Sequence, residues 1–278
     1  MAKIIDGKKI AEDIKVAIHK EIFQNSYQPN LAVILIGDDP ASQLYVSLKK
    51  EAAKKVGIEF HEYLLAEKTS QEEILKVIDF LNKDKDVDAI LVQLPLPKHL
   101  DTDLIIQALD PNKDVDGFHP QNIKNLLENK SDFIPGLPLG IVKLLDSTEE
   151  DLKNKKAIIV AKSEIFYQPL QKLLNQKEIK TKIVKPADPD LKNKTKEADI
   201  LITAIGQAFA IHPEMVKKDA IVIDVGTNQV GAYTVGDVDY SAVFEKVSYI
   251  TPVPGGVGPM TVAMLLYNTL QLYKKNRA

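Results

Sequence analysis

The chain has 278 residues and a formal net charge of −3, with 36 basic and 39 acidic side chains and no cysteine. This length favours two domains, and the balanced charge gives no reason to expect nucleic acid or a membrane surface as a partner. The lack of cysteine excludes disulfides, thiolate metal sites and cysteine nucleophiles. No apolar run is long enough to span a membrane and the amino terminus has no signal-peptide core, so a cytoplasmic protein is expected.

Short apolar strands alternate with helical patterns in the first half of the chain, which predicts a parallel sheet built from strand–helix–strand units. Strands are expected at 31–37, 58–64 and 89–93, and helices near 7–23, 40–56, 70–83 and 101–109. The helix at 40–56 has a natural N-cap in Asp39 and a natural end in Gly57. One apolar row of this helix is expected to face the sheet: Leu44, Leu48, Ala52 and Val56.

A second alternating series predicts another parallel sheet, with strands at 157–161, 182–184, 199–203 and 220–225. Between the two series, residues 110–138 are rich in proline, glycine, asparagine and charge, which indicates a connection rather than a core element. Residues 259–275 have the pattern of one amphipathic helix, which we expect to return and pack on the first domain. The expected fold class is α/β with two domains.

Three polar side chains share one stripe of the helix at 40–56. At about 100° per residue, Ser42, Tyr45 and Lys49 fall within a sector of roughly 60°. They follow the carboxyl end of a predicted parallel strand, where open α/β sheets bind ligands. The same spacing is also typical of an ordinary amphipathic helix with a surface lysine, so the spacing alone leaves both interpretations open.

Two further polar groups are candidates for the same site. Gln93 ends the apolar strand at 89–93, and a buried glutamine can accept a hydrogen bond from a lysine whose pKa burial has lowered. In the loop at 113–118, Asp116 is the better ligand candidate of two carboxylates. Each residue also has a structural interpretation, in loop hydrogen bonding or in an Asx turn. No metal site is predicted, because no third carboxylate or histidine lies nearby at a regular ligand spacing.

The segment 251–261 carries three glycines and three prolines before the last helix. Glycine allows a close backbone approach to a ligand, and proline fixes the shape of the loop. No P-loop lysine follows and the pattern fits no dinucleotide fingerprint, which argues against phosphate binding. The segment is therefore either a rigid wall beside a ligand or a plain connection between domains.

Together these segments resemble the bifunctional methylenetetrahydrofolate dehydrogenase/methenyltetrahydrofolate cyclohydrolase family. The resemblance covers nearly the whole chain and rests on these motifs: Ile5-Asp-Gly-Lys8, Gly37-Asp-Asp-Pro-Ala-Ser-Gln-Leu-Tyr-Val46, Val92-Gln-Leu-Pro-Leu-Pro97, Lys113-Asp-Val-Asp-Gly117, Asp224-Val-Gly226, Gly236-Asp-Val238 and Thr251-Pro-Val-Pro-Gly-Gly-Val-Gly-Pro-Met-Thr261. It implies oxidation of 5,10-methylenetetrahydrofolate with a nicotinamide dinucleotide, then hydrolysis of the methenyl cation to 10-formyltetrahydrofolate.

The resemblance also implies the arrangement of the domains. Residues 1–119 would form a three-layer α/β catalytic domain, to which the helix in 259–278 returns. Residues 120–258 would form a Rossmann-like parallel-sheet domain that binds the dinucleotide. A homodimer formed through this second domain is expected on the same basis.

Residue roles follow from the resemblance by motif. Lys49 would be the catalytic lysine, with Tyr45 against the folate ring and Gln93 modulating the lysine. Asp116 would bind the amino edge of the pterin, where two N–H donors meet two carboxylate oxygens. Five further residues would complete the folate site: Ser42, Pro254, Gly255, Gly256 and Val257.

The cofactor half departs from the family's pattern. The resemblance implies that NADP or NAD binds at five positions: Ala161, Lys162, Ser163, Gly206 and Thr227. The family's Gly-Arg-Ser is Ala161-Lys162-Ser163 here, and the glycine of its Ile-Val-Gly-x-Pro is Tyr167. Tyr167 puts a large side chain where backbone should approach pyrophosphate, although Lys162 can hold a 2′-phosphate as a point charge.

Three more departures follow. The family's His-Ser-Arg-Thr is not recognisable near Lys185, Gly206 is followed by Gln207, and Leu137 replaces a threonine. We hypothesise that the folate site is intact and that dinucleotide binding is weak, altered in preference or absent. A cyclohydrolase without dehydrogenase activity and a non-catalytic folate-binding protein are therefore alternatives to the bifunctional enzyme, and the polar cluster around Lys49 argues against the second of them.

Overall fold

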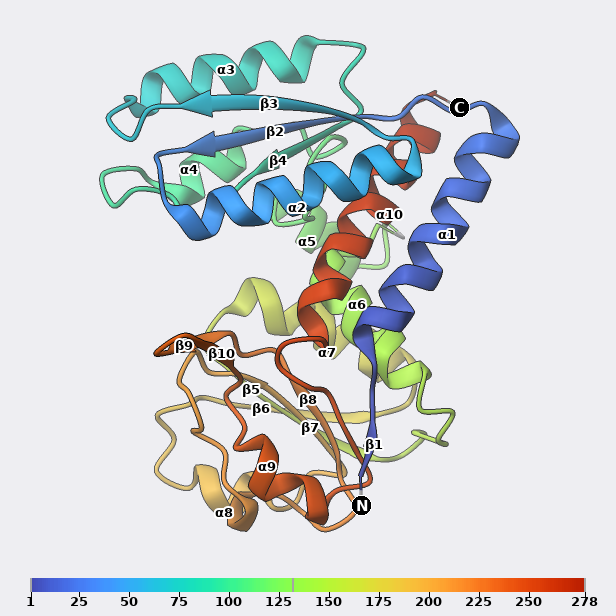
Figure 1. Cartoon of the computed structure of the whole chain (residues 1–278), viewed down its shortest axis with the longest axis vertical. Coiled ribbons are helices and arrows are strands. Elements are labelled where there is room, and N and C mark those ends of the chain that lie inside the picture. Colours follow the sequence, from blue (N-terminus) through green and yellow to red (C-terminus); the bar gives the residue numbers. More distant parts are fainter. Residues whose placement is uncertain (1, 132, 278) are drawn as a thin grey trace. The chain divides into compact units, whose positions relative to one another are not determined.

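The computed structural model describes residues 2–131 and 133–277 and divides into two compact units (Figure 1). The three-stranded unit comprises Glu12–Gly136 and Val262–Ala278, and the six-stranded unit comprises Met1–Ala11 and Leu137–Thr261. Helices α1 (Gly7–Asn25) and α10 (Val257–Arg277) each run from one unit into the other.

The three-stranded unit is built on a fully parallel sheet in the order β3-β2-β4. Its strands are β2 (Asn30–Ile36), β3 (Glu59–Leu65) and β4 (Ala89–Val92). Besides the segments of α1 and α10, its helices are α2 (Pro40–Val56), α3 (Gln71–Lys83), α4 (Thr102–Gln107) and α5 (Pro120–Leu127).

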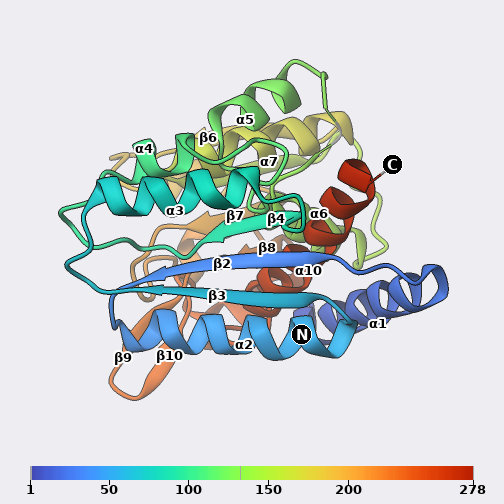
Figure 2. The ribbon, with the colours of Figure 1, turned by 90° about the horizontal axis from the view of Figure 1, so that it is seen from above.

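The central strand β2 explains the three layers of this unit. Its residues Leu31, Val33 and Leu35 pack in a core with α1, α2 and α10. The alternating residues Ala32, Ile34 and Ile36 pack in a second core with α3 and α4. Figure 2 shows α2 and α3 on opposite faces of the sheet. Because both faces are covered, the strand is a continuous apolar run rather than an alternating one.

Helix α2 begins and ends where the sequence predicts, but it presents a different face to the sheet. Asp39 accepts a hydrogen bond from the Ser42 amide (2.8 Å), and Gly57 ends the helix at a φ of 87°. The expected inward row is wrong at Leu44 and Leu48, which are 58% and 47% exposed. Ala52 and Val56 of the expected row are buried, and so are Val46 and Ala53, which were not part of it. Small alanines let the helix approach the sheet closely, and this contact fixes its rotation.

The six-stranded unit contains a parallel sheet in the order β1-β11-β8-β7-β5-β6. Its strands are β1 (Lys3–Ile4), β5 (Lys156–Ala161), β6 (Lys180–Val184), β7 (Ile200–Ala204), β8 (Ile221–Asp224) and β11 (Tyr249–Ile250). The other elements are α6 (Gly136–Asp146), α7 (Glu164–Gln176), α8 (Leu191–Thr195), α9 (Tyr240–Val243), the 3-10 turns η1 (Pro213–Met215) and η2 (Phe244–Lys246), and the hairpin of β9 (Asn228–Val230) and β10 (Tyr233–Val235). The two-domain α/β class with parallel sheets is confirmed.

Two features differ from the sequence-based expectation. The segment 110–138 is more than a connection, since it contains α5, which His119 caps and whose Ile123 and Leu126 are buried. The amino-terminal strand β1 pairs with β11, so the first residues of the chain lie in the six-stranded unit. The helix α10, in contrast, packs its buried leucines into the core of the three-stranded unit, as expected.

Candidate functional site

Lys49 and Gln93 meet at the carboxyl ends of β2 and β4 in the three-stranded unit. Lys49 lies on α2, and its Nζ donates a hydrogen bond to Gln93 Oε1 (2.8 Å). Gln93 is only 8% exposed, and its Nε2 donates to the Leu94 carbonyl (2.5 Å), so its oxygen is the atom left to face the lysine. Burial lowers the pKa of Lys49 because the charged ammonium loses hydration. The predicted lysine–amide pair is present.

Asp116 supplies a negative charge near this lysine. Protein around its carboxyl group raises the pKa of Asp116 to about 6, and the positive charge of Lys49 opposes this rise. Asp116 in turn opposes the fall of the Lys49 pKa. Within the described ranges, the two groups interact through charge and form no ion pair. The carboxylate is thus left available to a ligand, and the residue retains partial exposure.

The loop that carries Asp116 is attached to the sheet. Ile90 of β4 donates its amide to the Lys113 carbonyl (2.7 Å) and accepts from the Val115 amide (3.3 Å). Val115 is fully buried, and Gly117 has a φ of 76° that favours glycine. Asp116 is therefore presented from a short extension of the sheet rather than from a free loop.

The two other polar residues of the α2 stripe have different surroundings. Tyr45 is 43% exposed. Ser42 is buried at 4% exposure, and its hydrogen bonds to Asp39 lower the pKa of that carboxyl group. Ser42 therefore serves the N-cap of its own helix, whereas Tyr45 exposes part of its surface.

The glycine-rich loop belongs to the six-stranded unit, where it packs against the start of α1. A Cβ on Gly7 would lie 1.8 Å from the Gly256 carbonyl oxygen, and a Cβ on Gly256 would lie 2.6 Å from the Pro252 oxygen. The Lys8 amide donates to the Gly255 carbonyl (3.0 Å). Close backbone packing therefore requires Gly7 and Gly256, and the segment from Pro254 to Val257 is held in a fixed shape.

The predicted dinucleotide residues that follow β5 and β7 lie at the switch point of the six-stranded sheet. The connection from β5 leads outward to β6, while β7 lies on the other side of β5, and ligands bind at such a point. Lys162 and Ser163 follow Ala161, the end of β5, and Ser163 begins α7 without a capping hydrogen bond from its side chain. Gly206 follows β7 with a φ of 72° and open space at its Cβ position. Thr227 is exposed after β8.

Tyr167 forms a cluster with charged neighbours at this edge. Its hydroxyl donates to Glu164 Oε1 (2.7 Å). Lys185, which directly follows β6, places its Nζ 4.6 Å from the centre of the Tyr167 ring and donates to the Lys162 carbonyl (3.1 Å). The Tyr167 side chain therefore contacts the residue that follows β6, and Lys162 and Lys185 lie close together there. The sequence analysis did not single out Lys185 as a binding residue.

Sequence reasoning also missed two buried carboxylates that shape this edge. Asp237 accepts hydrogen bonds from the amides of Ile205 (2.5 Å), Gly206 (3.1 Å) and Gln207 (3.0 Å). Asp224 accepts from the amides of Gly226 (2.9 Å), Asp237 (3.1 Å) and Val238 (2.9 Å). A signal was available in the sequence, because each aspartate lies within two residues of a glycine in the motifs Asp224-Val-Gly226 and Gly236-Asp-Val238. Cβ atoms on Gly226 and Gly236 would collide with these carboxylates.

Two further findings concern the described residues. No group of three or more histidine, cysteine, aspartate or glutamate side chains there could hold a metal ion. In the same ranges, no helix combines the length and apolarity that a membrane crossing requires.

Comparison with known proteins identifies the family. The catalytic-domain model of tetrahydrofolate dehydrogenase/cyclohydrolase matches residues 5–116, and the NAD(P)-binding-domain model of the same family matches residues 135–277. The chain belongs to the tetrahydrofolate dehydrogenase/cyclohydrolase family. The two matched regions cover most of the three-stranded unit and most of the six-stranded unit, together with α10, and leave out residues 117–134.

Individual members of the tetrahydrofolate dehydrogenase/cyclohydrolase family match over the full length. "Bifunctional protein FolD" of Nitratiruptor sp. is 47% identical, covering 99% of each chain. The crystal structure of the bifunctional enzyme FolD from Campylobacter jejuni has a TM-score of 0.94 at 42% identity, again covering 99% of each chain. The Trypanosoma brucei enzyme, solved with NADP cofactor and inhibitor, has a TM-score of 0.93 at 32% identity, covering 99% of this chain and 98% of that one.

Proposed function

We propose that the protein oxidises 5,10-methylenetetrahydrofolate to the methenyl form and hydrolyses that product to 10-formyltetrahydrofolate. The observation that carries this proposal is the hydrogen-bonded pair of Lys49 and Gln93, with Asp116 close enough to interact by charge. The bifunctional names of the relatives favour both activities over a cyclohydrolase alone. A non-catalytic binding protein would have no need for a desolvated lysine beside a carboxylate.

The proposed hydrolysis assigns Lys49 the movement of one proton. Water attacks the electron-poor carbon between two folate nitrogens, and its proton passes to the neutral amine of Lys49 as the C–O bond forms. The proton then returns to N5 as the C–N5 bond breaks, and the remaining hydroxyl proton is released to solvent as the C=O bond forms, which leaves the formyl group on N10. Gln93 holds the amine through its oxygen, and the lowered pKa of Lys49 increases the neutral fraction.

In this proposal Asp116 binds the pterin and Tyr45 lies against its ring. A carboxylate offers two acceptors to the ring N–H and amino groups, a strong and directional pairing. Tyr45 has an exposed ring surface next to Lys49 on α2. We include Ser42 and the segment Pro254–Val257 in the folate site on the resemblance.

The residues at the switch point fit a dinucleotide. The uncapped amides at the start of α7 can take a phosphate, and the open backbone at Gly206 allows a close approach. We assign the pyrophosphate to Ala161, Lys162 and Ser163, and the other half of the cofactor to Gly206 and Thr227. When bound, the nicotinamide accepts a hydride from the methylene carbon.

We propose NADP rather than NAD as that cofactor. At the end of the second strand of a dinucleotide fold, an acidic residue pairs with the ribose hydroxyls of NAD, whereas a cation accommodates the 2′-phosphate of NADP. Here the position is Lys185, and Lys162 lies beside it. The NADP-bound trypanosomal relative supports the same choice. Tyr167 remains the argument for weak binding, and titration with NADP and NAD tests it.

We also propose a homodimer through the six-stranded unit and a cytoplasmic location. The exposed Val230 and Tyr233 of the β9–β10 hairpin support an interface, being 43% and 75% exposed. Light scattering after size-exclusion chromatography tests the dimer, and cell fractionation tests the location.

The division at residues 119 and 258 also stays a proposal, which limited proteolysis tests.

The decisive experiment measures both half-reactions of the purified protein by absorbance, with each nicotinamide cofactor, beside a Lys49→Gln control. Wild-type protein should form methenyltetrahydrofolate with NADP and hydrolyse it, and the variant should lose the hydrolysis. Hydrolysis without any cofactor-dependent absorbance change would instead support the cyclohydrolase-only alternative. A Lys49→Gln variant with unchanged turnover would refute the catalytic assignment.

A further inference from the structure

Two buried polar side chains beside Asp116 are not used by the proposed chemistry. Asp114 is 1% exposed and Asn268 of α10 is 2% exposed. Both belong to the three-stranded unit, and each bonds the backbone next to Asp116. Burying a carboxylate and an amide is costly unless each forms hydrogen bonds that the fold needs.

Asp114 fixes the backbone on the carboxyl side of Asp116. Its Oδ1 accepts from the Gly117 amide (3.1 Å), and its Oδ2 accepts from the His119 amide (2.8 Å) and from Asn122 Nδ2 (3.0 Å). The peptide that follows Asp116 is thereby held in the turn that the positive φ of Gly117 creates.

Asn268 fixes the backbone on the amino side. Its Nδ2 donates to the carbonyl of Val115 (3.0 Å), which belongs to the peptide bond that joins Val115 to Asp116. The same nitrogen donates to the Ile134 carbonyl (3.1 Å). With Asp114, this contact fixes the backbone on both sides of Asp116 and therefore the direction in which its side chain leaves the backbone.

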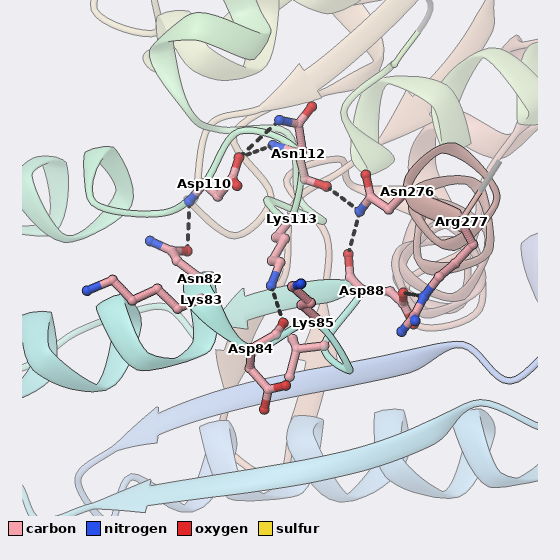
Figure 3. A pocket seen from close by; sticks show the side chains of 11 residues that line it. Asn82, Lys83, Asp84, Lys85, Asp88, Asp110, Asn112, Lys113, Asn276 and Arg277 are labelled. Carbon is pink, nitrogen blue, oxygen red and sulfur yellow. Dashed lines mark hydrogen bonds and ion pairs between the residues drawn. The ribbon is translucent and has the colours of Figure 1, made fainter.

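The beginning of the same loop is held at a polar cavity of about 410 Å³, shown in Figure 3. There Asn276 of α10 donates to the carbonyls of Asn112 (3.1 Å) and Asp88 (3.4 Å). Lys113 Nζ donates to the carbonyls of Asp84 (2.5 Å) and Leu81 (2.9 Å). Asn276 is thus a counterpart of Asn268: the same residue type on the same helix, bonded to two carbonyls, but exposed and farther along the chain from Asp116.

We propose that Asp114 and Asn268 are positioning residues of the folate site, which fix the two peptide units around Asp116 and so aim its carboxylate at the amino edge of the pterin. The inference rests on the proposed function and adds two residues to it. Neither residue touches the substrate in this scheme. Their effect on turnover passes through Asp116.

Asp114 has a second effect through its charge. The groups that act electrostatically on Asp116 are Lys49 of α2, which lowers its pKa, and Asp114 of its own loop, which raises it. Removing the charge of Asp114 therefore lowers the pKa of Asp116, and the acid limb of the pH profile should move to lower pH. A residue with a merely structural role would not move that limb.

The test compares Asp114→Asn, Asn268→Leu and the control Asn276→Leu with wild-type and Asp116→Asn proteins in the cyclohydrolase assay. Asn268→Leu should raise the KM for methenyltetrahydrofolate on the order of 10- to 100-fold, as Asp116→Asn should also do, because a charge-assisted pair is misaligned. The value of kcat should fall less. Asn276→Leu should stay within about twofold of wild type, and Asp114→Asn should also shift the acid limb.

The possible outcomes distinguish a failure of the proposed function from a failure of the positioning role. If the wild-type protein turned over no folate, the proposed function itself would fail. If it were active while Asn268→Leu and Asn276→Leu gave equal KM values, or while Asp114→Asn kept a wild-type KM, the positioning role alone would be overturned, and an acid limb left in place by Asp114→Asn would overturn the charge effect. Should Asp114→Asn not fold, the milder Asn122→Ala, which removes one donor to Asp114, takes its place, and a wild-type KM in that variant also counts against the role.

Discussion

At Asp116 and Lys49, burial shifts the pKa of each group toward neutral pH. The pKa of Asp116 is raised to about 6, and that of Lys49 is lowered. Below pH 6 the protonated Asp116 cannot accept from both pterin donors, and a protonated Lys49 cannot take a proton from water. Both effects raise activity with pH.

We therefore expect kcat/KM for methenyl hydrolysis to fall by at least about tenfold per pH unit below pH 6, once the spontaneous hydrolysis is subtracted. This ratio reports the pKa values of the free enzyme. Asp116→Asn should lose the component with a pKa near 6 and keep only the one that belongs to Lys49. A profile that stays flat between pH 5 and 7 in the wild-type protein would contradict the assignment.

The lysine after β6 supports a prediction about cofactor choice. Replacing Lys185 with glutamate puts a negative charge where we assign the 2′-phosphate, so the KM for NADP should rise by at least about tenfold. The KM for NAD should change little or fall, because a carboxylate can pair with the ribose hydroxyls. Lys180→Glu, at the opposite end of the same strand, is the control. Equal effects of the two variants on NADP would argue against a 2′-phosphate site at Lys185.

At the scale of elements, the N-cap of α2 connects stability to the site, because this helix carries Tyr45 and Lys49. Asp39→Ala removes the acceptor for the Ser42 amide and should lower the melting temperature by roughly 3 °C. Asp38→Ala, the adjacent exposed aspartate without a capping role, should leave it unchanged. Calorimetry of both variants measures the difference, and equal melting temperatures would show that the cap contributes nothing measurable.

Local signals predicted elements better than they predicted how the elements pack. Continuous apolar runs identified β2 and β4, and Asp39 with Gly57 identified both ends of α2. The rotation of α2 was missed, since closeness to the sheet selects Ala53 rather than the larger Leu44. Helix α5 was missed because its polar composition hides a short buried stripe.

The candidate site shows the same division. Lys49, Gln93 and Asp116 could be found because their residue types and positions indicate chemistry. Asp237 was missed, because an aspartate is ordinarily exposed, and only the folded backbone supplies the amide donors that make its burial favourable. The pairing of β1 with β11 joins strands at opposite ends of the chain, a contact with no local signal.

At the scale of the molecule, the loops of the six-stranded unit depend on carboxylates buried inside it. Asp224 is 3% exposed, and burial raises its pKa to about 6, with the nearby charge of Asp237 adding to the rise. Three backbone amides that donate to Asp224 act in the opposite direction. Within the described residues, no buried side-chain nitrogen or oxygen lacks a hydrogen-bond partner. The hydrogen bonds only partly offset the effects of burial and of the Asp237 charge. The ionised form of Asp224 is therefore less favourable in the folded protein than in water.

This cost makes stability depend on pH with a definite sign. The pKa of Asp224 is about 6 in the folded state and near 3.8 in the unfolded chain, so the folded state binds more protons between these values. Its contribution to stability is present below pH 3.8 and is lost as the pH rises through 6, a change of about 3 kcal/mol. Asp224→Asn should remove this dependence, although it also loses acceptors for backbone amides. Urea unfolding from pH 4.5 to 7 measures the difference in slope, and parallel curves for wild type and variant would show that Asp224 is already ionised throughout.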